Sequence, residues 1–361
     1  MASKLLADYP WVSAPIIVNA PMTGFAGAAL AAAVSTAGGI GLLASDTMDQ
    51  LSAELDRAKT SLLSSDSPNP SLNLNPNSRT TLPVGVGFLL FYHKLDTALP
   101  VLAAHKPAIV WLFAAPQLAD YGVWAAVIRA ATPNSKIWVQ VGSVTAALEV
   151  ARANAPPDVL VLQGADAGGH GFARGAGIVS LLPEATDALR ASGLGHVPIV
   201  ASGGIVDGRG VAAALALGAA GVVMGTRFLA AAETKVHPRY REAVLNTKDG
   251  ALSTARSGMF DELRGPSIWP TGYDGRALAV GGSYADWSEG GMDIERIREL
   301  HGKAAADALA GDGWNPRAAV WAGTGVGIVT QTQPAADIVA EVRSAAQRVV
   351  RGLVLPGAPT Y

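Results

Sequence analysis

The chain has 361 residues, half of them hydrophobic, and a formal net charge of −2 from 27 basic and 29 acidic residues. This composition excludes a disordered chain, and a balanced charge without a basic stripe excludes nucleic acid as an expected partner. The complete lack of cysteine excludes disulfides, thiolate metal sites and a cysteine nucleophile.

Short apolar runs alternate with helical patterns along most of the chain. The runs are centred near residues 17, 41, 86, 110, 139, 160, 199 and 222. The helical patterns lie at 26–36, 48–63, 95–105, 117–131, 144–154, 178–191 and 210–217. Buried strands that alternate with helices imply a parallel sheet, and eight such units favour a closed (β/α)8 TIM barrel over an open doubly wound sheet. No complete G-x-G-x-x-G motif follows a strand, which disfavours a dinucleotide-binding fold.

Polar residues mark the expected starts of three of these helices. Ser143 and Asp207 each stand directly before a helical pattern, and Asp46 or Thr47 precedes another. Their side-chain oxygens can accept hydrogen bonds from the free N–H groups of the first helical turn. We therefore expect these residues to be N-caps.

The regular alternation ends after residue 224, so the chain divides into three expected parts. Residues 1–229 would form the barrel. Residues 230–325 hold helical patterns at 239–246, 293–300 and 304–310 among loops rich in Gly, Trp and Tyr, and would form a helical subdomain over the C-terminal mouth. Residues 326–361 would supply a helix at 335–351 that packs back on the barrel. Residues 64–81, rich in Ser, Pro and Asn, would form a surface loop.

Two apolar stretches, 25–44 and 211–226, have to be weighed as membrane spans. The first has no charged residue over twenty positions, which is long enough to cross a bilayer. It is mostly Ala and Gly with polar interruptions, so we predict a buried helix followed by a strand, and glycines break the second stretch in the same way. The N-terminus has Asp8 and Pro10 where a signal peptide needs an apolar core. The expectation is a soluble cytoplasmic protein with no membrane partner.

The stretch 158–171, DVLVLQGADAGGHG, is the expected centre of the chemistry. A buried strand at 159–162 ends in polar and glycine residues that we do not expect to form a strand. Gly168 and Gly169 allow the backbone to approach a flat ligand closely. His170 would then lie at the barrel mouth, where its near-neutral titration suits proton transfer or the binding of an anion. A structural histidine is the alternative. The other five histidines lack this setting and are assigned to the surface or to packing: His93, His105, His196, His237 and His301.

Two glycine turns follow the last two strands of the series. They are Ser202-Gly203-Gly204 and Gly225-Thr226, and barrels of this class bind phosphate after strands seven and eight. Exposed backbone N–H groups beside a helix start would form such a site, whereas the alternative is that the glycines only make tight turns. No cluster has metal-ligand spacing, because Asp166 and His170 lie in a glycine loop without a third ligand. We expect no metal, and Asp166 would orient local backbone.

These motifs together resemble the nitronate monooxygenase family, formerly called 2-nitropropane dioxygenases. The resemblance rests on PMTG at 21–24 with AAAVSTAGGIG, QGADAGGH at 163–170, SGGI at 202–205 with DGR at 207–209, and MGTRF at 224–228. It covers residues 14–232 and returns with GTGVGIV at 323–329. Members of that family are FMN-dependent (β/α)8 enzymes, so the resemblance implies FMN as the cofactor.

The resemblance also implies a role for each matching residue. His170 would be the catalytic histidine facing the substrate. The implied cofactor-binding residues are Pro21, Met22, Thr23, Gly24, Gln140, Gln163, Gly168, Gly169, Ser202, Gly203, Gly204, Met224, Gly225 and Thr226. Two positions depart from the family pattern, since Asp166 stands where many members have Glu and Gln140 where Lys is frequent. If Gln140 lies near the pyrimidine edge of the flavin, the positive charge that stabilises reduced flavin is weakened or comes from elsewhere.

The function implied by the resemblance is FMN-dependent oxidation of alkyl nitronates by O2 to a carbonyl compound and nitrite. Neutral nitroalkanes are further candidate substrates, with His170 as base or electrostatic partner. The alternatives are an FMN- and NAD(P)H-dependent enoyl-thioester reductase and a catalytically silent flavin-binding protein. Inosinate-dehydrogenase-like chemistry fails because it needs a cysteine. The sequence leaves the oligomeric state open, with a homodimer as one option.

Overall fold

Eight parallel strands form the centre of the computed structural model, which describes residues 2–64, 72 and 80–353. The strands are β1 (Ile16–Asn19), β2 (Leu42–Ala44), β3 (Leu82–Leu89), β4 (Pro107–Phe113), β5 (Lys136–Val141), β6 (Val159–Gln163), β8 (Ile199–Ser202) and β9 (Gly221–Met224). Their order is β1-β9-β8-β6-β5-β4-β3-β2, and a parallel bridge between Val18 and Ile40 joins the two ends. The predicted (β/α)8 barrel is therefore confirmed.

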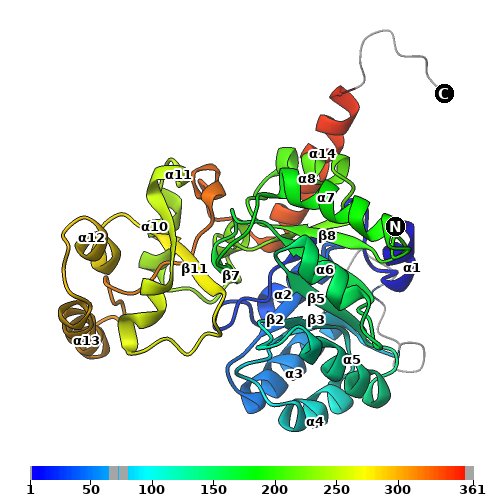
Figure 1. Ribbon diagram of the computed structural model, residues 1–361, viewed down its shortest axis with the longest axis horizontal. Coiled ribbons are helices and arrows are strands. Elements are labelled where there is room, and N and C mark those ends of the chain that lie inside the picture. Colours follow the sequence, from blue (N-terminus) through cyan, green and yellow to red (C-terminus); the bar gives the residue numbers. More distant parts are fainter. Residues whose placement is uncertain (1, 65–71, 73–79, 354–361) are drawn as a thin grey trace.

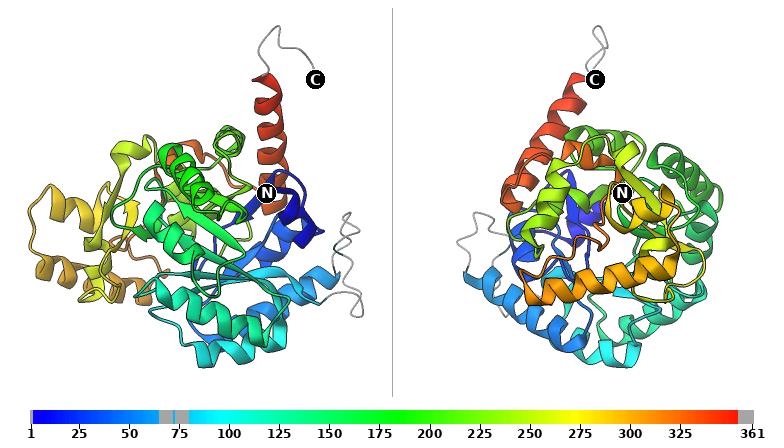
Figure 2. Two further views of the ribbon diagram at one scale, coloured as in Figure 1. Left: turned by 45° about the vertical axis from the view of Figure 1, so that its right-hand side comes forward. Right: turned by 90° about the vertical axis from the view of Figure 1, so that its left-hand side faces the viewer.

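Helices surround the barrel on its outside (Figure 2). They are α2 (Ala28–Thr36), α3 (Met48–Ser64), α4 (Leu95–His105), α5 (Ala119–Ala131), α6 (Val144–Ala151), α7 (Ile178–Ala191) and α8 (Gly208–Ala216). Two of the predicted caps are confirmed, because Ser143 accepts from the Ala146 N–H at 3.2 Å and Asp207 from the Arg209 N–H at 2.9 Å. Of the two N-cap candidates for α3, Asp46 and Thr47, the structure supports Thr47, whose Oγ1 accepts from the Gln50 N–H at 3.3 Å.

The barrel core is apolar because the central strands are covered on both faces. Trp138 in β5 is fully buried and stacks on Trp111 in β4. Its indole N–H donates to the Tyr9 hydroxyl at 2.8 Å. Tyr9 follows α1 (Ala2–Asp8), a short helix that the sequence pattern did not indicate. The stretch 25–44 holds α2 and β2 as predicted, and no helix within the described ranges is both long and apolar enough to cross a membrane.

Residues 226–334 lie mainly to one side of the barrel, as an extension that we call the lid (Figure 1). Its helices are α9 (Thr226–Leu229), α10 (Pro238–Asn246), α11 (Gly250–Ser253), α12 (Gly282–Ser288), α13 (Ile294–Ala310) and the 3₁₀ helices η2 (Gly258–Arg264) and η3 (Thr324–Ile328). The helices predicted at 293–300 and 304–310 are one continuous helix, α13.

The lid, expected to be a helical subdomain, contains its helices and also a small antiparallel sheet that the sequence did not indicate. Strands β10 (Thr254–Ser257) and β11 (Tyr273–Leu278) pair with each other, and β11 also pairs with β7 (Gly169–Phe172). His170 therefore lies within a strand, opposite Gly275, and not in an irregular turn. The glycine-rich β7 has no strand signal of its own, because its regular backbone depends on a partner a hundred residues later.

The final helix, α14 (Ala335–Gly352), packs on α8 and α2. Arg343 fastens it by donating to the carbonyls of Ala37 at 3.1 Å and Gly38 at 2.8 Å. The predicted helix at 335–351 is confirmed, while most of the loop predicted at 64–81 lies outside the described residues. The division at 229/230 and 325/326 stays a proposal.

Candidate active site

A cavity of about 590 Å³ lies where the carboxyl ends of the barrel strands meet the lid. Its volume is typical of a site for a small molecule or cofactor. The predicted site residues in its lining are Pro21, Met22, Thr23, Gln140, Gln163, Gly168, Gly169, His170, Ser202, Gly225 and Thr226. The predicted residues outside its lining are Gly24, Gly203, Gly204 and Met224. Met224 is fully buried within the barrel core.

The turns after β8 and β9 lie side by side, because these strands are neighbours and Ser202 pairs with Val223. The backbone N–H groups of Gly203, Gly204, Gly225 and Thr226 have no acceptor among the described residues. Gly203 and Thr226 are buried, and buried N–H groups are normally paired, so this cluster of free donors at two neighbouring strand ends fits an anion such as a phosphate group. Thr226 also joins this turn to the segment before η3, because its Oγ1 accepts from the Gly323 N–H at 3.0 Å.

The backbone geometry at position 203 requires glycine. Its φ is +101°, and a Cβ there would lie 2.7 Å from the carbonyl oxygen of Gly164. The turn is therefore built for close packing of the β8 and β6 ends against each other.

Polar side chains along the barrel wall have unused hydrogen-bonding groups. Gln140 and Ser202 are buried, yet neither the Gln140 amide nor the Ser202 hydroxyl has a hydrogen-bond partner in the described part of the chain. Gln163 donates from Nε2 to the His170 carbonyl at 3.1 Å. Because buried polar groups are usually satisfied, these groups on a cavity wall fit a ligand with a polar edge, such as a flavin ring.

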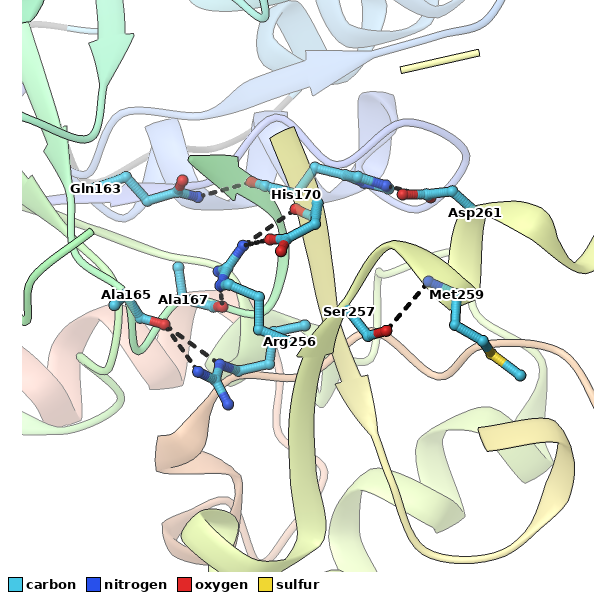
Figure 3. Close-up of polar contacts among 10 residues, drawn as sticks. Gln163, Ala165, Ala167, His170, Arg256, Ser257, Met259 and Asp261 are labelled. Carbon is cyan, nitrogen blue, oxygen red and sulfur yellow. Dashed lines mark hydrogen bonds and ion pairs between the residues drawn. The ribbon is translucent and has the colours of Figure 1, made fainter. Parts of the chain in front are cut away.

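His170 is held by three lid residues that the sequence did not reveal. Its Nε2 lies 2.6 Å from Oδ1 of Asp261, whose side chain is only 6% exposed (Figure 3). Trp269 stacks on the imidazole with ring centres 3.7 Å apart and 8° between the planes. Trp321 lies 4.7 Å away at a steeper angle. All of these residues line the cavity, so the structure brings the predicted catalytic histidine to the predicted cofactor wall.

Two lid arginines fix the loop between β6 and β7 (Figure 3). Arg256 donates to the Ala167 carbonyl at 3.0 Å and to the Asp274 carboxylate at 2.9 Å. Arg276 donates to the Ala165 carbonyl, and burial lowers its pKa while the neighbouring Arg256 adds to that effect. Asp166 contacts a distant lid residue, because its carboxylate accepts from the Thr324 hydroxyl at 3.2 Å and its backbone carbonyl accepts from the Thr324 N–H at 3.0 Å. Its expected role in orienting local backbone stays a prediction.

From the sequence, His301 was assigned to the surface or to packing. The side chain is buried, and it also lines the cavity, which the sequence did not indicate. Burial lowers its pKa, and the nearby positive charges of Arg264 and Arg317 act in the same direction. No group of three potential ligands within the described ranges is arranged to hold a metal ion.

Comparison with known proteins gives consistent matches over most of the chain. The family model described as "Nitronate monooxygenase" matches residues 9–68 and 84–344. The chain is 43% identical to the nitronate monooxygenase npaC of Metarhizium robertsii, over 97% of this chain and 96% of that one. It is 40% identical to a nitronate monooxygenase of Neurospora crassa, over 97% and 93% of the two chains.

Among solved structures, the chain is similar to FabK from Thermotoga maritima. The TM-score is 0.73, the sequence identity is 24%, and the match covers 97% of each chain. A likeness at this level of identity concerns the fold alone, and it supports the barrel-and-lid arrangement described above.

Proposed function

This chain belongs to the nitronate monooxygenase family of enzymes, and on that premise we propose that it oxidises alkyl nitronates to carbonyl compounds and nitrite with FMN and O2. The observation that carries the proposal is that His170 lines the same cavity as Gly225 and Thr226, whose free N–H groups suit a phosphate. The side chains of Gln140 and Gln163 line this cavity as well and suit a polar ring. Neutral nitroalkanes are proposed as additional substrates.

The residues at the carboxyl ends of the barrel strands fit the proposed cofactor. The free N–H groups at 203–204 and 225–226 would hold the FMN phosphate, and Gln140 and Gln163 would face the ring. Pro21 packs directly on Gly87, where a Cβ would lie 2.6 Å away, and so forms a flat wall for the ring. When bound, FMN supplies the electron-accepting and oxygen-reacting chemistry that no side chain of this chain provides.

The side chains opposite the proposed ring would bind and orient the substrate. A protonated imidazole at His170 attracts a nitronate anion, whereas a neutral one can remove the α-proton of a nitroalkane. The indole of Trp269 also packs against Phe91, with ring centres 4.6 Å apart, so aromatic walls exclude water from this end of the cavity. Exclusion of water strengthens the attraction between the imidazole and the anion.

The test begins with the visible spectrum of the purified protein and identification of the released flavin. The protein is then mixed without oxygen with propionate 3-nitronate or with NADH, and bleaching of the flavin is recorded. The proposal expects bleaching by the nitronate and none by NADH. Bleaching by NADH alone would favour the enoyl-thioester reductase, and no bleaching by either would favour a silent flavin-binding protein. A preparation that contains no flavin and does not take up added FMN would contradict the proposal.

A further inference from the structure

The carboxylate of Asp261 has one hydrogen-bond partner in the described part of the chain, and that partner is Nε2 of His170. The carboxylate is nearly buried, with 6% of the side chain exposed. A buried carboxylate is costly unless a donor or a cation satisfies it. Because an ionised carboxylate only accepts hydrogen bonds, Nε2 must carry a proton for this contact to form.

The other ring nitrogen of His170, Nδ1, has no hydrogen-bond partner among residues 2–64, 72 and 80–353. The ring cannot turn freely to exchange the two nitrogens, because Trp269 stacks on its face at 3.7 Å and Trp321 lies beside it. The backbone is fixed as well, since β7 pairs with β11 and Gln163 holds the His170 carbonyl. The neutral imidazole therefore has one defined form, with the proton on Nε2 and the lone pair on Nδ1.

We propose that Asp261 is a positioning residue that makes Nδ1 of His170 the proton-accepting atom in the oxidation of neutral nitroalkanes. This inference rests on the proposed function. In the proposed step the α-carbon–hydrogen bond breaks and the proton moves to Nδ1. The electron pair of that bond forms the carbon–nitrogen double bond, and the negative charge goes to the nitro oxygens. The imidazolium that results is stabilised by the carboxylate at its other nitrogen.

A nitronate has already lost this proton, so its oxidation does not need the base. The two substrates therefore report on different properties of the same site. Loss of the Asp261 carboxylate should slow the nitroalkane reaction far more than the nitronate reaction, which loses only part of the attraction between the imidazolium and the anion. A residue that only stabilised the fold would affect both reactions equally.

The experiment compares the wild-type holoenzyme with Asp261→Asn, which keeps the size of the side chain. The control is Glu262→Gln, which removes the neighbouring carboxylate of η2, one that pairs with Arg298 and not with the histidine. Nitrite release is measured with a neutral nitroalkane and with its pre-formed nitronate. For Asp261→Asn we expect kcat/KM for the nitroalkane to fall about 100-fold or more, while the value for the nitronate stays within about threefold.

A second readout is independent of activity. The ring nitrogens of [15N]histidine-labelled holoenzyme are observed by NMR across the alkaline range, with His170→Asn to assign the signal. We expect the neutral ring of the wild type to carry its proton on Nε2, and this preference to be lost in Asp261→Asn. This measurement on the wild type decides the question even if the variant does not fold.

Three results would overturn the inference: a wild-type ring with the proton on Nδ1, a ring that stays doubly protonated at alkaline pH, or an Asp261→Asn variant that changes both reactions equally or neither. If the wild type oxidises neither substrate, the proposed function fails, and the NMR result still decides whether Asp261 sets the protonation of His170.

Discussion

Arg256 offers the sharpest test of how the lid supports the active site. Its guanidinium joins three parts of the chain, because it donates to Asp274 in β11 and to the Ala167 carbonyl in the loop that leads to His170. The side chains of Arg256 and Asp274 are only 10% and 17% exposed. Replacement by methionine keeps most of the volume but leaves the Asp274 carboxylate and the Ala167 carbonyl without this donor.

Loss of one partner from a buried ion pair typically costs 3–5 kcal/mol, and we expect Arg256→Met to lower the free energy of unfolding by about 3 kcal/mol. The assay is urea denaturation of the holoenzyme, together with nitrite release. The nitroalkane reaction should also slow, because the loop that positions His170 becomes less ordered and small displacements of a catalytic group are costly.

A matched control is Arg296→Met, which breaks the pair with Glu299 on the exposed surface of α13. Since both of its side chains are more than 60% exposed, this change should cost no more than about 0.5 kcal/mol. The double variant Arg256→Met/Asp274→Leu should recover part of the stability, because both buried charges are then removed. If Arg256→Met costs no more than Arg296→Met, the reasoning about the buried pair is refuted.

Three further predictions address the catalytic base, the phosphate turn and acid stability. His170→Asn should retain flavin and lower nitroalkane turnover by about 10²–10⁴-fold. The control His196→Asn, at an exposed histidine, should change neither flavin content nor turnover. Unchanged turnover in His170→Asn would refute the role of His170 as the base. Gly203→Ala should lower the ratio of bound flavin to protein, because a Cβ would lie 2.7 Å from the Gly164 carbonyl oxygen, whereas Gly302→Ala, with nothing within 4 Å, should keep it. Burial alone would raise the pKa of Glu54, but hydrogen bonds from Lys235, the Ala28 N–H and Arg57 outweigh it and lower that pKa. The stability that Glu54 contributes is therefore present above pH 4.5 and lost as the pH falls through its lowered value, so Glu54→Gln should be less stable at pH 7 and should lose less stability on acidification.

The barrel could be predicted from the sequence because its signals are local. Each central strand is an apolar run, and Ser143 and Asp207 stand at the helix starts that they cap. The small sheet of the lid could not be predicted, because none of β7, β10 and β11 is an apolar run and the three strands depend on one another for their hydrogen bonds. Helix α13 was divided in two because Gly302 interrupts its pattern, although nothing crowds that position.

The candidate site also combines residues that local sequence patterns mark with residues that only distant contacts bring together. Its barrel half follows from residues at strand ends, which a sequence pattern can mark. Asp261 lies 91 residues from His170 and belongs to a 3₁₀ helix without a motif, so no periodicity or spacing relates the two. The Gly-, Trp- and Tyr-rich loops expected over the barrel mouth indicated no particular residue.

The barrel and the lid support the chemistry in different ways. The strand ends provide backbone donors and flat walls, and these features would serve any reaction of a bound flavin. The protonation and orientation of the His170 imidazole depend instead on lid residues. Asp261 contacts Nε2, Trp269 stacks on the ring, and Arg256 fixes the loop before His170. Changes in the lid should therefore alter the choice between nitroalkane and nitronate without loss of flavin, whereas changes at the turn around Gly203 should abolish both reactions together.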